Sequence, residues 1–223
     1  MEKFLTWPIH LRSPARQPER ELPGAVLTLS PPFRADALPD EVGLLLPNRD
    51  GLRLAREVVA AAPQAVAGKA LGLFLADPFL HVESLAAELA GFGVSWAANF
   101  PSVEQQDLEF SQQLADVGLD AASERTRLAG FRDAGFGILA VVADAEGAVA
   151  ARDLAPAAIL VLPRVADFAA GFPSFRQRGA AASAVRESGW DGPLLALGHG
   201  EEAARESLWP DAVDGLLLRP AGR

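Results

Sequence analysis

The sequence predicts an α/β protein built as one (β/α)8 TIM barrel, and three observations lead to this fold class. The chain has 223 residues, 50% of them hydrophobic, which suits one packed domain of this architecture. Eight short apolar runs recur along it, and they are continuous rather than alternating, as in parallel strands covered on both faces. Amphipathic segments separate most of the runs, which is typical of βαβ units. The eight runs are Ala25–Leu29, Val42–Leu46, Ala70–Ala76, Val94–Ala98, Gly137–Val142, Ala158–Leu162, Pro193–Leu197 and Val213–Leu218.

The start of the chain is the least regular part of this pattern. Residues 1–23 are rich in Pro and Arg and show no hydrophobic period, so we expect an N-terminal arm there. Residues 24–223 are expected to form the single barrel domain. Only about a dozen residues join the first two runs, which is short for a crossover helix. Either the first βα unit is degenerate, or Val42–Leu46 is not a barrel strand.

Helices are expected in the later connections. Leu52–Ala62 carries its apolar residues on one face, and the segment 82–90 follows Asp77-Pro78, with the proline in the first turn. A capping box from Ser102 to Gln105 opens the next helix. An open doubly wound sheet is the alternative architecture, but the chain lacks the Gly-rich dinucleotide and Walker loops. Further helices are expected at Ala121–Ala134, Glu146–Leu154, Phe175–Glu187 and Glu201–Ser207.

The composition excludes several classes of function. The chain has no cysteine, which rules out disulfides, thiolate metal sites and a cysteine nucleophile. The net charge of −9 argues against nucleic acid and anionic membranes as partners, because both bind cationic surfaces. No secretory signal or membrane-spanning run is visible, and we expect a cytoplasmic protein. A homo-oligomer or a protein partner remains open.

Function in a parallel barrel lies at the rim where the strands end, so the residues just after each run are the candidates. Arg49, Arg164 and Arg219 offer planar, paired donors for a carboxylate or phosphate, which suggests a site for a small anionic ligand. His199 is the only histidine expected at this rim and suits a general acid or base. Asn99 follows an apolar strand. A polar side chain there needs hydrogen-bond partners within the protein or a role in binding a ligand.

Each candidate also has a structural interpretation. Asp77 would be a good helix N-cap, and Asp144 should cap the helix that follows it. The rim arginines could pair with neighbouring carboxylates, and a lone histidine without a partner is more often non-catalytic. No two histidines have the spacing of zinc ligands. Magnesium needs only one or two carboxylates and stays open through Asp77 or Asp50.

Five short segments between residues 42 and 200 carry a further signal through their order and spacing. They resemble motifs of the phosphoenolpyruvate hydrolase-like family, also called TIM-barrel signal-transduction proteins. An Asp-Pro-Phe followed about twenty residues later by Asn-Phe-Pro is the more specific part of the match. The segments are Leu-Leu-Leu-Pro-Asn-Arg-Asp at 44–50, Leu-Ala-Asp-Pro-Phe at 75–79, Asn-Phe-Pro-Ser-Val at 99–103, Gly118-Leu119 with Glu124 beyond, and Leu-Gly-His-Gly at 197–200.

The chain departs from the family in its rim loops. Residues 104–108 replace the family's Gly-Leu-Ile-Asp-Gly, and Pro163-Arg164 stands where the family has a histidine after the sixth strand. Glu201 replaces the second glycine after His-Gly, and a Ser-Gly-Arg-rich segment after the second strand is missing. Polar, flexible rim loops have been replaced by plain helix starts.

The resemblance implies two hypotheses. In the first, the chain is a hydrolase or lyase that acts on a phosphoenolpyruvate-like acid or another small anionic carboxylate. Asp77 would then hold Mg2+ or orient a water, Asn99 would polarise a carbonyl or enolate oxygen, and His199 would move the proton. The substrate would be bound by Arg49, Arg164, Arg219, Gly198 and Gly200.

In the second hypothesis, the chain is a catalytically eroded TIM barrel that acts as a binding or assembly subunit. The substituted rim and the missing segment favour it. The rim itself should distinguish the two. A polar pocket that holds Asp77, Asn99 and His199 favours the enzyme, whereas a rim filled by Phe79, Phe100 or tryptophan side chains favours the scaffold.

Overall fold

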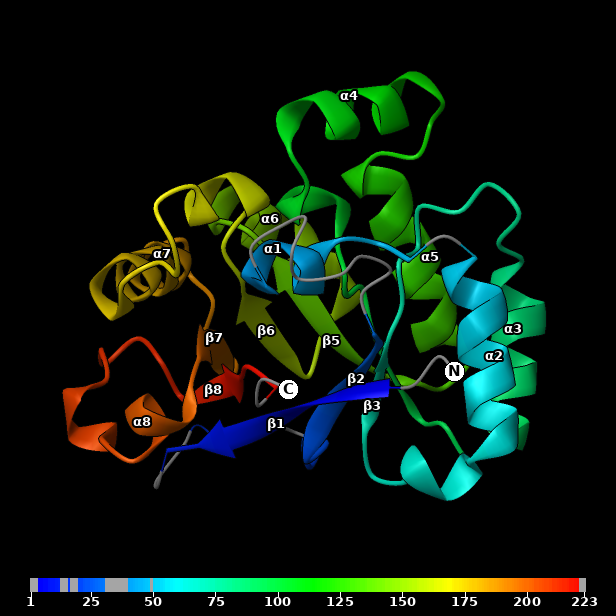
Figure 1. Ribbon diagram of the computed structural model, residues 1–223, viewed down its shortest axis with the longest axis horizontal. Coiled ribbons are helices and arrows are strands. Elements are labelled where there is room, and N and C mark those ends of the chain that lie inside the picture. The colour runs from blue at the N-terminus through cyan, green and yellow to red at the C-terminus, as the bar shows by residue number, and fades with distance from the viewer. Residues whose placement is uncertain (1–3, 13–15, 17–19, 31–39, 49, 221–223) are drawn as a thin grey trace.

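A computed structural model describes residues 4–12, 16, 20–30, 40–48 and 50–220, apart from the side chains of residues 40 and 41. Within these residues eight strands close into a barrel in sequence order, as Figure 1 shows. The α/β barrel expected from the sequence is therefore confirmed. The strands are β1 (Phe4–Leu11), β2 (Ala25–Leu29), β3 (Ala70–Gly72), β4 (Trp96–Ala98), β5 (Gly137–Val142), β6 (Ala158–Val161), β7 (Leu194–Gly198) and β8 (Gly215–Leu218).

Apart from Thr28 in β2, the parallel strands contain no polar side chain, because both of their faces are covered. In β5, Leu139 and Val141 belong to a cluster that fills the barrel interior. The alternate residues Ile138 and Ala140 belong to a second cluster between the sheet and the surrounding helices. Every residue of β5 is buried, so its sequence cannot alternate between apolar and polar.

The expectation that the N-terminal arm lies outside the barrel is wrong for residues 4–11, which form the barrel strand β1. This strand pairs antiparallel with both β2 and β8, so it closes the barrel between its first and last parallel strands. Trp7 is its buried anchor, at 1% exposure, and its indole Nε1 donates to Thr28 Oγ1 at 2.8 Å. Most other β1 residues are partly or fully exposed, which explains why no continuous apolar run marks the strand.

The strand expected at Val42–Leu46 is also wrong, because these residues lie largely in the short helix α1 (Asp40–Leu45). An apolar run of this length is ambiguous between a strand and a buried helix. Val42 and Leu45 point into the interior cluster of the barrel. The second of the two possibilities left open by the short connection is the correct one, and β1 supplies the eighth strand.

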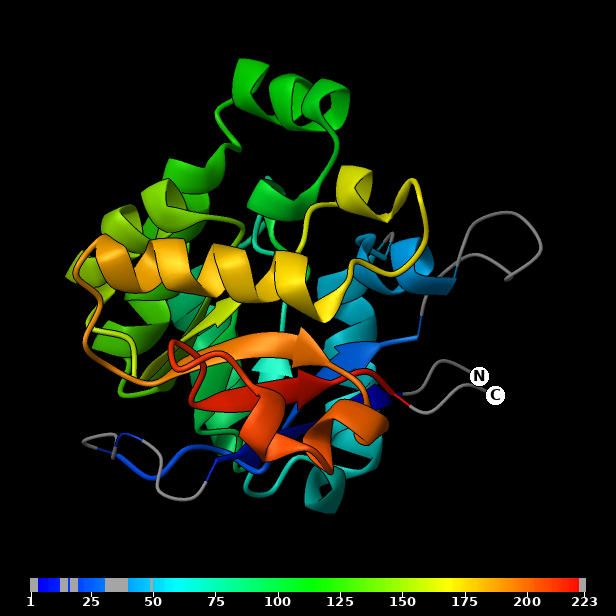
Figure 2. The same ribbon diagram turned by 90° about the vertical axis from the view of Figure 1, so that its left-hand side faces the viewer.

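The longer helices surround the barrel, as the two views in Figures 1 and 2 show. Ser102 does form a capping box, but it opens a single turn, η2 (Val103–Gln105), and Asp107 caps the helix that follows. His81, rather than Asp77, is the N-cap residue of the helix after β3. The helices are α2 (Gly51–Ala61), α3 (Val82–Gly91), α4 (Leu108–Asp116), α5 (Ala121–Asp133), α6 (Ala145–Ala151), α7 (Phe175–Glu187) and α8 (Gly200–Ala203), with 3-10 turns η1 (Pro63–Ala65), η3 (Arg152–Leu154), η4 (Val165–Phe168) and η5 (Glu206–Leu208).

Candidate functional site

Apolar side chains fill the carboxyl end of the barrel interior. Phe100 follows β4 directly, is fully buried, and packs edge-to-face on Trp7 with ring centroids 4.9 Å apart. Val42 and Leu45 of α1 and Phe168 of η4 belong to the same interior cluster. These residues come from the connections after β2, β4 and β6, which are the connections that line the mouth of a parallel barrel. Where the structure describes it, the mouth is therefore packed with hydrocarbon.

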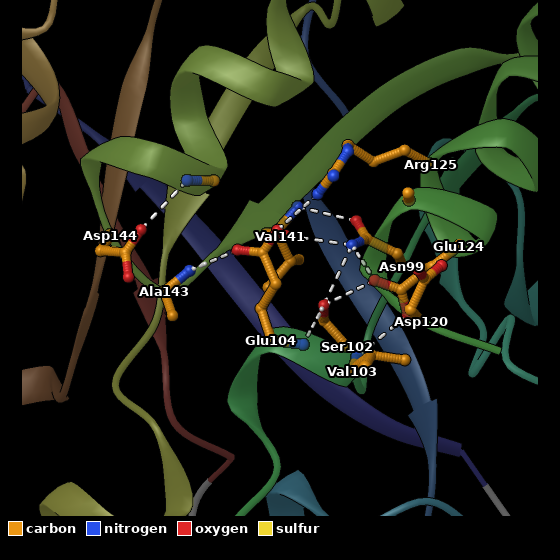
Figure 3. Close-up of polar contacts among 12 residues, drawn as sticks. Asn99, Ser102, Val103, Glu104, Asp120, Glu124, Arg125, Val141, Ala143 and Asp144 are labelled. Atoms are coloured by element: carbon orange, nitrogen blue, oxygen red, sulfur yellow. Dashed lines mark hydrogen bonds and ion pairs between the residues drawn. The ribbon is translucent and has the colours of Figure 1, made fainter. Parts of the chain in front are cut away.

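Asn99 uses its side chain to tie β4 to β5. Its Oδ1 accepts a hydrogen bond from the Val141 amide at 2.8 Å, and its Nδ2 donates to the Val141 carbonyl at 3.0 Å. The same nitrogen lies 2.8 Å from Glu124 Oε2 and 3.2 Å from Ser102 Oγ (Figure 3). With 3% exposure, the amide is wholly engaged inside the protein. The polar group after the strand is thus satisfied by the fold itself.

Glu124 of α5 is the centre of this polar cluster. Its carboxyl is 1% exposed and accepts hydrogen bonds from Ser102 Oγ at 2.6 Å and from the Val103 amide at 3.1 Å, besides that from Asn99. Burial raises the pKa of Glu124 to about 7, since removal from water penalises the charged form. The three hydrogen bonds offset part of that effect. Glu124 therefore changes protonation close to neutral pH.

A second carboxyl, Glu104, links the same cluster to the connection after β5. Its Oε1 pairs with Arg125 at 2.9 Å, and its Oε2 accepts from the Ala143 amide at 3.2 Å. Burial raises the pKa of Glu104 as well. A Cβ on Gly147 would overlap the Glu104 carboxylate, so a side chain at this position in α6 would force that carboxylate to move.

Asp144 and Arg164 lie beside this connection and pair with each other. Asp144 caps α6 by accepting from the Gly147 amide at 3.0 Å, as expected from the sequence. Its other oxygen lies 2.5 Å from Arg164 Nη2. The Arg164 amide also donates to Asp167 at 2.7 Å. Arg164, expected to bind an anion, is thus already next to two carboxylates.

His199 lies at the end of β7 as the N-cap residue of α8. Its backbone amide donates to Glu202 Oε2 at 3.2 Å, and its ring Nε2 lies 3.5 Å from Glu202 Oε1. The imidazole is 44% exposed and lies beside the Phe172 ring. Glu202 is held in turn by Arg178, whose side chain is only 2% exposed and also donates to the Pro173 and Leu197 carbonyls. His199 accordingly has a carboxylate partner.

The remaining candidates are Asp77, Arg219 and the two glycines that flank His199. Asp77 accepts from the Phe79 amide at 2.8 Å in the turn after β3. Arg219 follows β8, and its amide donates to the Gly198 carbonyl at 2.8 Å. A Cβ on Gly198 would contact Leu216, whereas one on Gly200 would meet open space. Arg49 lies outside the described residues.

A pocket of about 270 Å³ lies at the same end of the molecule, outside the barrel interior and against the first turns of α7. Its lining combines small apolar residues with Asp167, Gln177 and Arg178. Val161 belongs to the cluster between sheet and helices, which places the pocket between these layers. Asp77, Asn99 and His199 are absent from the described lining. The lining residues are Ala143, Val161, Pro163, Asp167, Pro173, Gln177, Arg178 and Ala181.

The structure places Asp77, Asn99 and His199 at the same end of the barrel, after β3, β4 and β7. It connects none of them to another by a described hydrogen bond or ion pair. Instead it brings together Asn99 and Glu124, and His199 and Glu202. Glu124 was part of the family resemblance. Its burial could not be predicted from the sequence, because a glutamate in the first turn of a helix is usually exposed.

Comparisons with known proteins identify no family for this chain. No protein-family model matches the chain, and no curated protein matches it. Among solved structures, the EAL domain of FimX from Xanthomonas citri in complex with c-diGMP is similar at 16% identity and a TM-score of 0.47, covering 97% of this chain and 85% of that one. A nitroalkane oxidase from Streptomyces ansochromogenes is similar at 17% identity and a TM-score of 0.35 over 75% of this chain. The match spans 46% of the oxidase.

The described residues also bear on metals and membranes. No group of three or more His, Asp or Glu side chains among them is placed to hold a metal ion together. No described helix has both the length and the apolar character needed to cross a bilayer.

Proposed function

We propose that this TIM-barrel protein is a catalytically eroded barrel that acts as a binding or assembly subunit. The observation that carries the proposal is the filled mouth of the barrel. Phe100, Phe168 and the α1 residues Val42 and Leu45 occupy the space in which TIM-barrel enzymes place their substrate. A reacting molecule would have to displace side chains that are at most 8% exposed.

The polar candidates support the same proposal. The Asn99 amide is committed to Val141 and Glu124, so it has no remaining hydrogen to polarise a substrate oxygen. Arg164 is paired with Asp144, and Asp77 closes a turn through the Phe79 amide. These residues have structural partners of the kind that make ordinary rim contacts.

An assay of turnover tests the proposal. Wild type, Asn99→Ala and His199→Ala should release no pyruvate or inorganic phosphate from phosphoenolpyruvate above the buffer rate, with or without magnesium. Related short anionic acids should behave in the same way. Turnover by wild type that falls about 100-fold or more in both variants would contradict the proposal, because the loss of an acid–base group or an oxyanion donor has that size.

The second candidate is a phosphoenolpyruvate hydrolase-like enzyme that acts on a small anionic acid. The observation that favours it is His199, which is partly exposed at the end of β7 with Glu202 3.5 Å from its ring nitrogen. A carboxylate in this position can orient an imidazole for proton transfer. On this hypothesis Asp77→Asn should abolish turnover by removing charge, while folding stays unchanged. A short anionic acid should also raise the Tm of wild type and have no effect on an Arg164→Ala, Arg219→Ala double variant.

A further inference from the structure

The negative charge of this protein is concentrated in one stretch of chain. The whole chain has 29 Asp and Glu against 20 Lys and Arg, for a net charge of −9. Residues 70–124 hold nine Asp and Glu and no Lys or Arg. The rest of the chain is therefore balanced, and the excess charge lies between β3 and the first turn of α5.

Helix α4, in the middle of this stretch, stands away from the barrel in both views (Figures 1 and 2). Leu114 is its only buried residue. A small cluster separate from the two main cores holds the helix, in which Phe110 stacks on Phe74 with ring centroids 6.5 Å apart. The helix thus exposes most of its surface.

The exposed part of α4 combines apolar and acidic side chains. Leu108 is 86% exposed at the first turn, and Val117 is 69% exposed at the C-cap position. The carboxylates on and beside the helix form no ion pair with any described Lys or Arg; they accept hydrogen bonds from backbone amides or glutamine side chains. We call this region the α4 surface, and it comprises Asp107, Leu108, Glu109, Asp116, Val117 and Asp120.

We propose that the α4 surface docks a Lys/Arg-rich amphipathic segment of a protein partner. Cationic side chains would pair with carboxylates of this surface, and apolar ones would cover Leu108 at the first turn of the helix. Charge complementarity of this kind selects the partner and speeds association. A second copy of the chain fits less well, because it would bring acidic surfaces together. The inference rests on the binding role proposed above and names the class of partner.

A labelled synthetic helical peptide, with leucines on one face and lysines and arginines on the other, is the probe. Its binding is measured by fluorescence anisotropy at an ionic strength of about 0.15 M. The test variant is Asp107→Asn, Glu109→Gln, Asp116→Asn, in which α4 keeps its cap because asparagine caps helices as well as aspartate does. The control is Glu146→Gln, Asp153→Asn, Glu187→Gln, which removes the same charge from exposed positions elsewhere. We expect the Kd to rise about tenfold or more for the test variant and less than about twofold for the control.

The apolar part of the surface has its own control. Leu108→Ser should weaken binding of the leucine peptide. A second peptide has the same charge but serines in place of the leucines, and its binding should not change. Circular dichroism of each variant confirms that it is folded.

Several outcomes would overturn the inference. The first is that the leucine peptide does not bind wild type. The second is that its affinity falls equally in the test and control charge variants. The third is that Leu108→Ser leaves its affinity unchanged. A wild-type dimer in sedimentation that Leu108→Ser separates would assign the surface to a second copy instead. Turnover on anionic acids would refute the binding role itself, and peptide binding is measured independently of it.

Discussion

At the scale of single residues, the Asn99, Ser102 and Glu124 cluster shows how polar groups at a barrel rim can serve the fold. Its hydrogen bonds connect β4, η2, α5 and β5 around one fully buried carboxyl. A buried polar network is stable only when its members are satisfied, and an ionisable member makes stability depend on pH.

Glu124 should make folding less stable as pH rises from about 4.5 to 7. Its folded pKa of about 7 exceeds the ordinary value of 4.5 because of burial, so the folded state binds more protons in this window. The stabilisation is complete below the lower value and lost above the upper one. The shift corresponds to about 3 kcal/mol of unfolding free energy.

The variant Glu124→Gln tests this assignment, because glutamine resembles the protonated acid and does not titrate. We expect it to remove most of the slope in urea unfolding measured between pH 4.5 and 7.5. The difference between wild type and variant isolates Glu124 from Glu104, whose pKa is also raised. A difference that stays constant across that range would show that Glu124 does not titrate there.

Gly147 and Glu104 provide a second residue-scale prediction. Gly147→Ala should lower stability by about 1 kcal/mol or more, since the new Cβ displaces Glu104 from the Ala143 amide. In a Glu104→Ala background the same change should stabilise by up to about 1 kcal/mol, because alanine favours a helix over glycine. Urea unfolding of wild type, the two single variants and the double variant gives the four free energies of unfolding. If Gly147→Ala changed the free energy of unfolding in the same direction with and without Glu104, the contact between the two residues would be contradicted.

At the scale of elements, β1 decides whether the sheet closes. It is the only described strand that runs antiparallel to its neighbours, and it covers edges of β2 and β8 that would otherwise be open. Trp7 holds it through Thr28 and Phe100, in the same cluster that α1 and η4 complete.

Trp7→Ala should therefore destabilise the protein by about 3–5 kcal/mol, as for other large buried aromatic residues. Phe79→Ala is the matched control, because Phe79 is 87% exposed and its loss should change stability by less than about 0.5 kcal/mol. Chemical denaturation followed by circular dichroism gives both values. Similar small effects for both residues would mean that β1 does not hold the barrel closed.

At the scale of the whole molecule, two features distinguish this protein from a TIM barrel whose mouth is open to a substrate. Its mouth is filled by side chains from three connections, and its excess negative charge lies in the stretch of chain that forms α3, α4 and the start of α5. The first feature supports a binding role and predicts the absence of turnover. The second indicates where a partner would bind.

The parallel part of the barrel was predictable from the sequence because strands buried on both faces must be continuously apolar. The order of the runs and the helices between them follow from that constraint, and the expected cap at Asp144 was local enough to be read directly. The sequence also determined the absence of cysteine chemistry and the sign of the net charge.

Only the tertiary structure decided which elements close the barrel and fill it. An antiparallel strand with one buried anchor, Trp7, has no strong periodicity, and the run at 42–46 suits a strand or a helix until its neighbours are known. The roles of Asn99 and Glu124 depend on contacts with residues more than 20 positions away. Local sequence sets the preference of each segment, but burial and partner choice come from parts of the chain that meet only after folding.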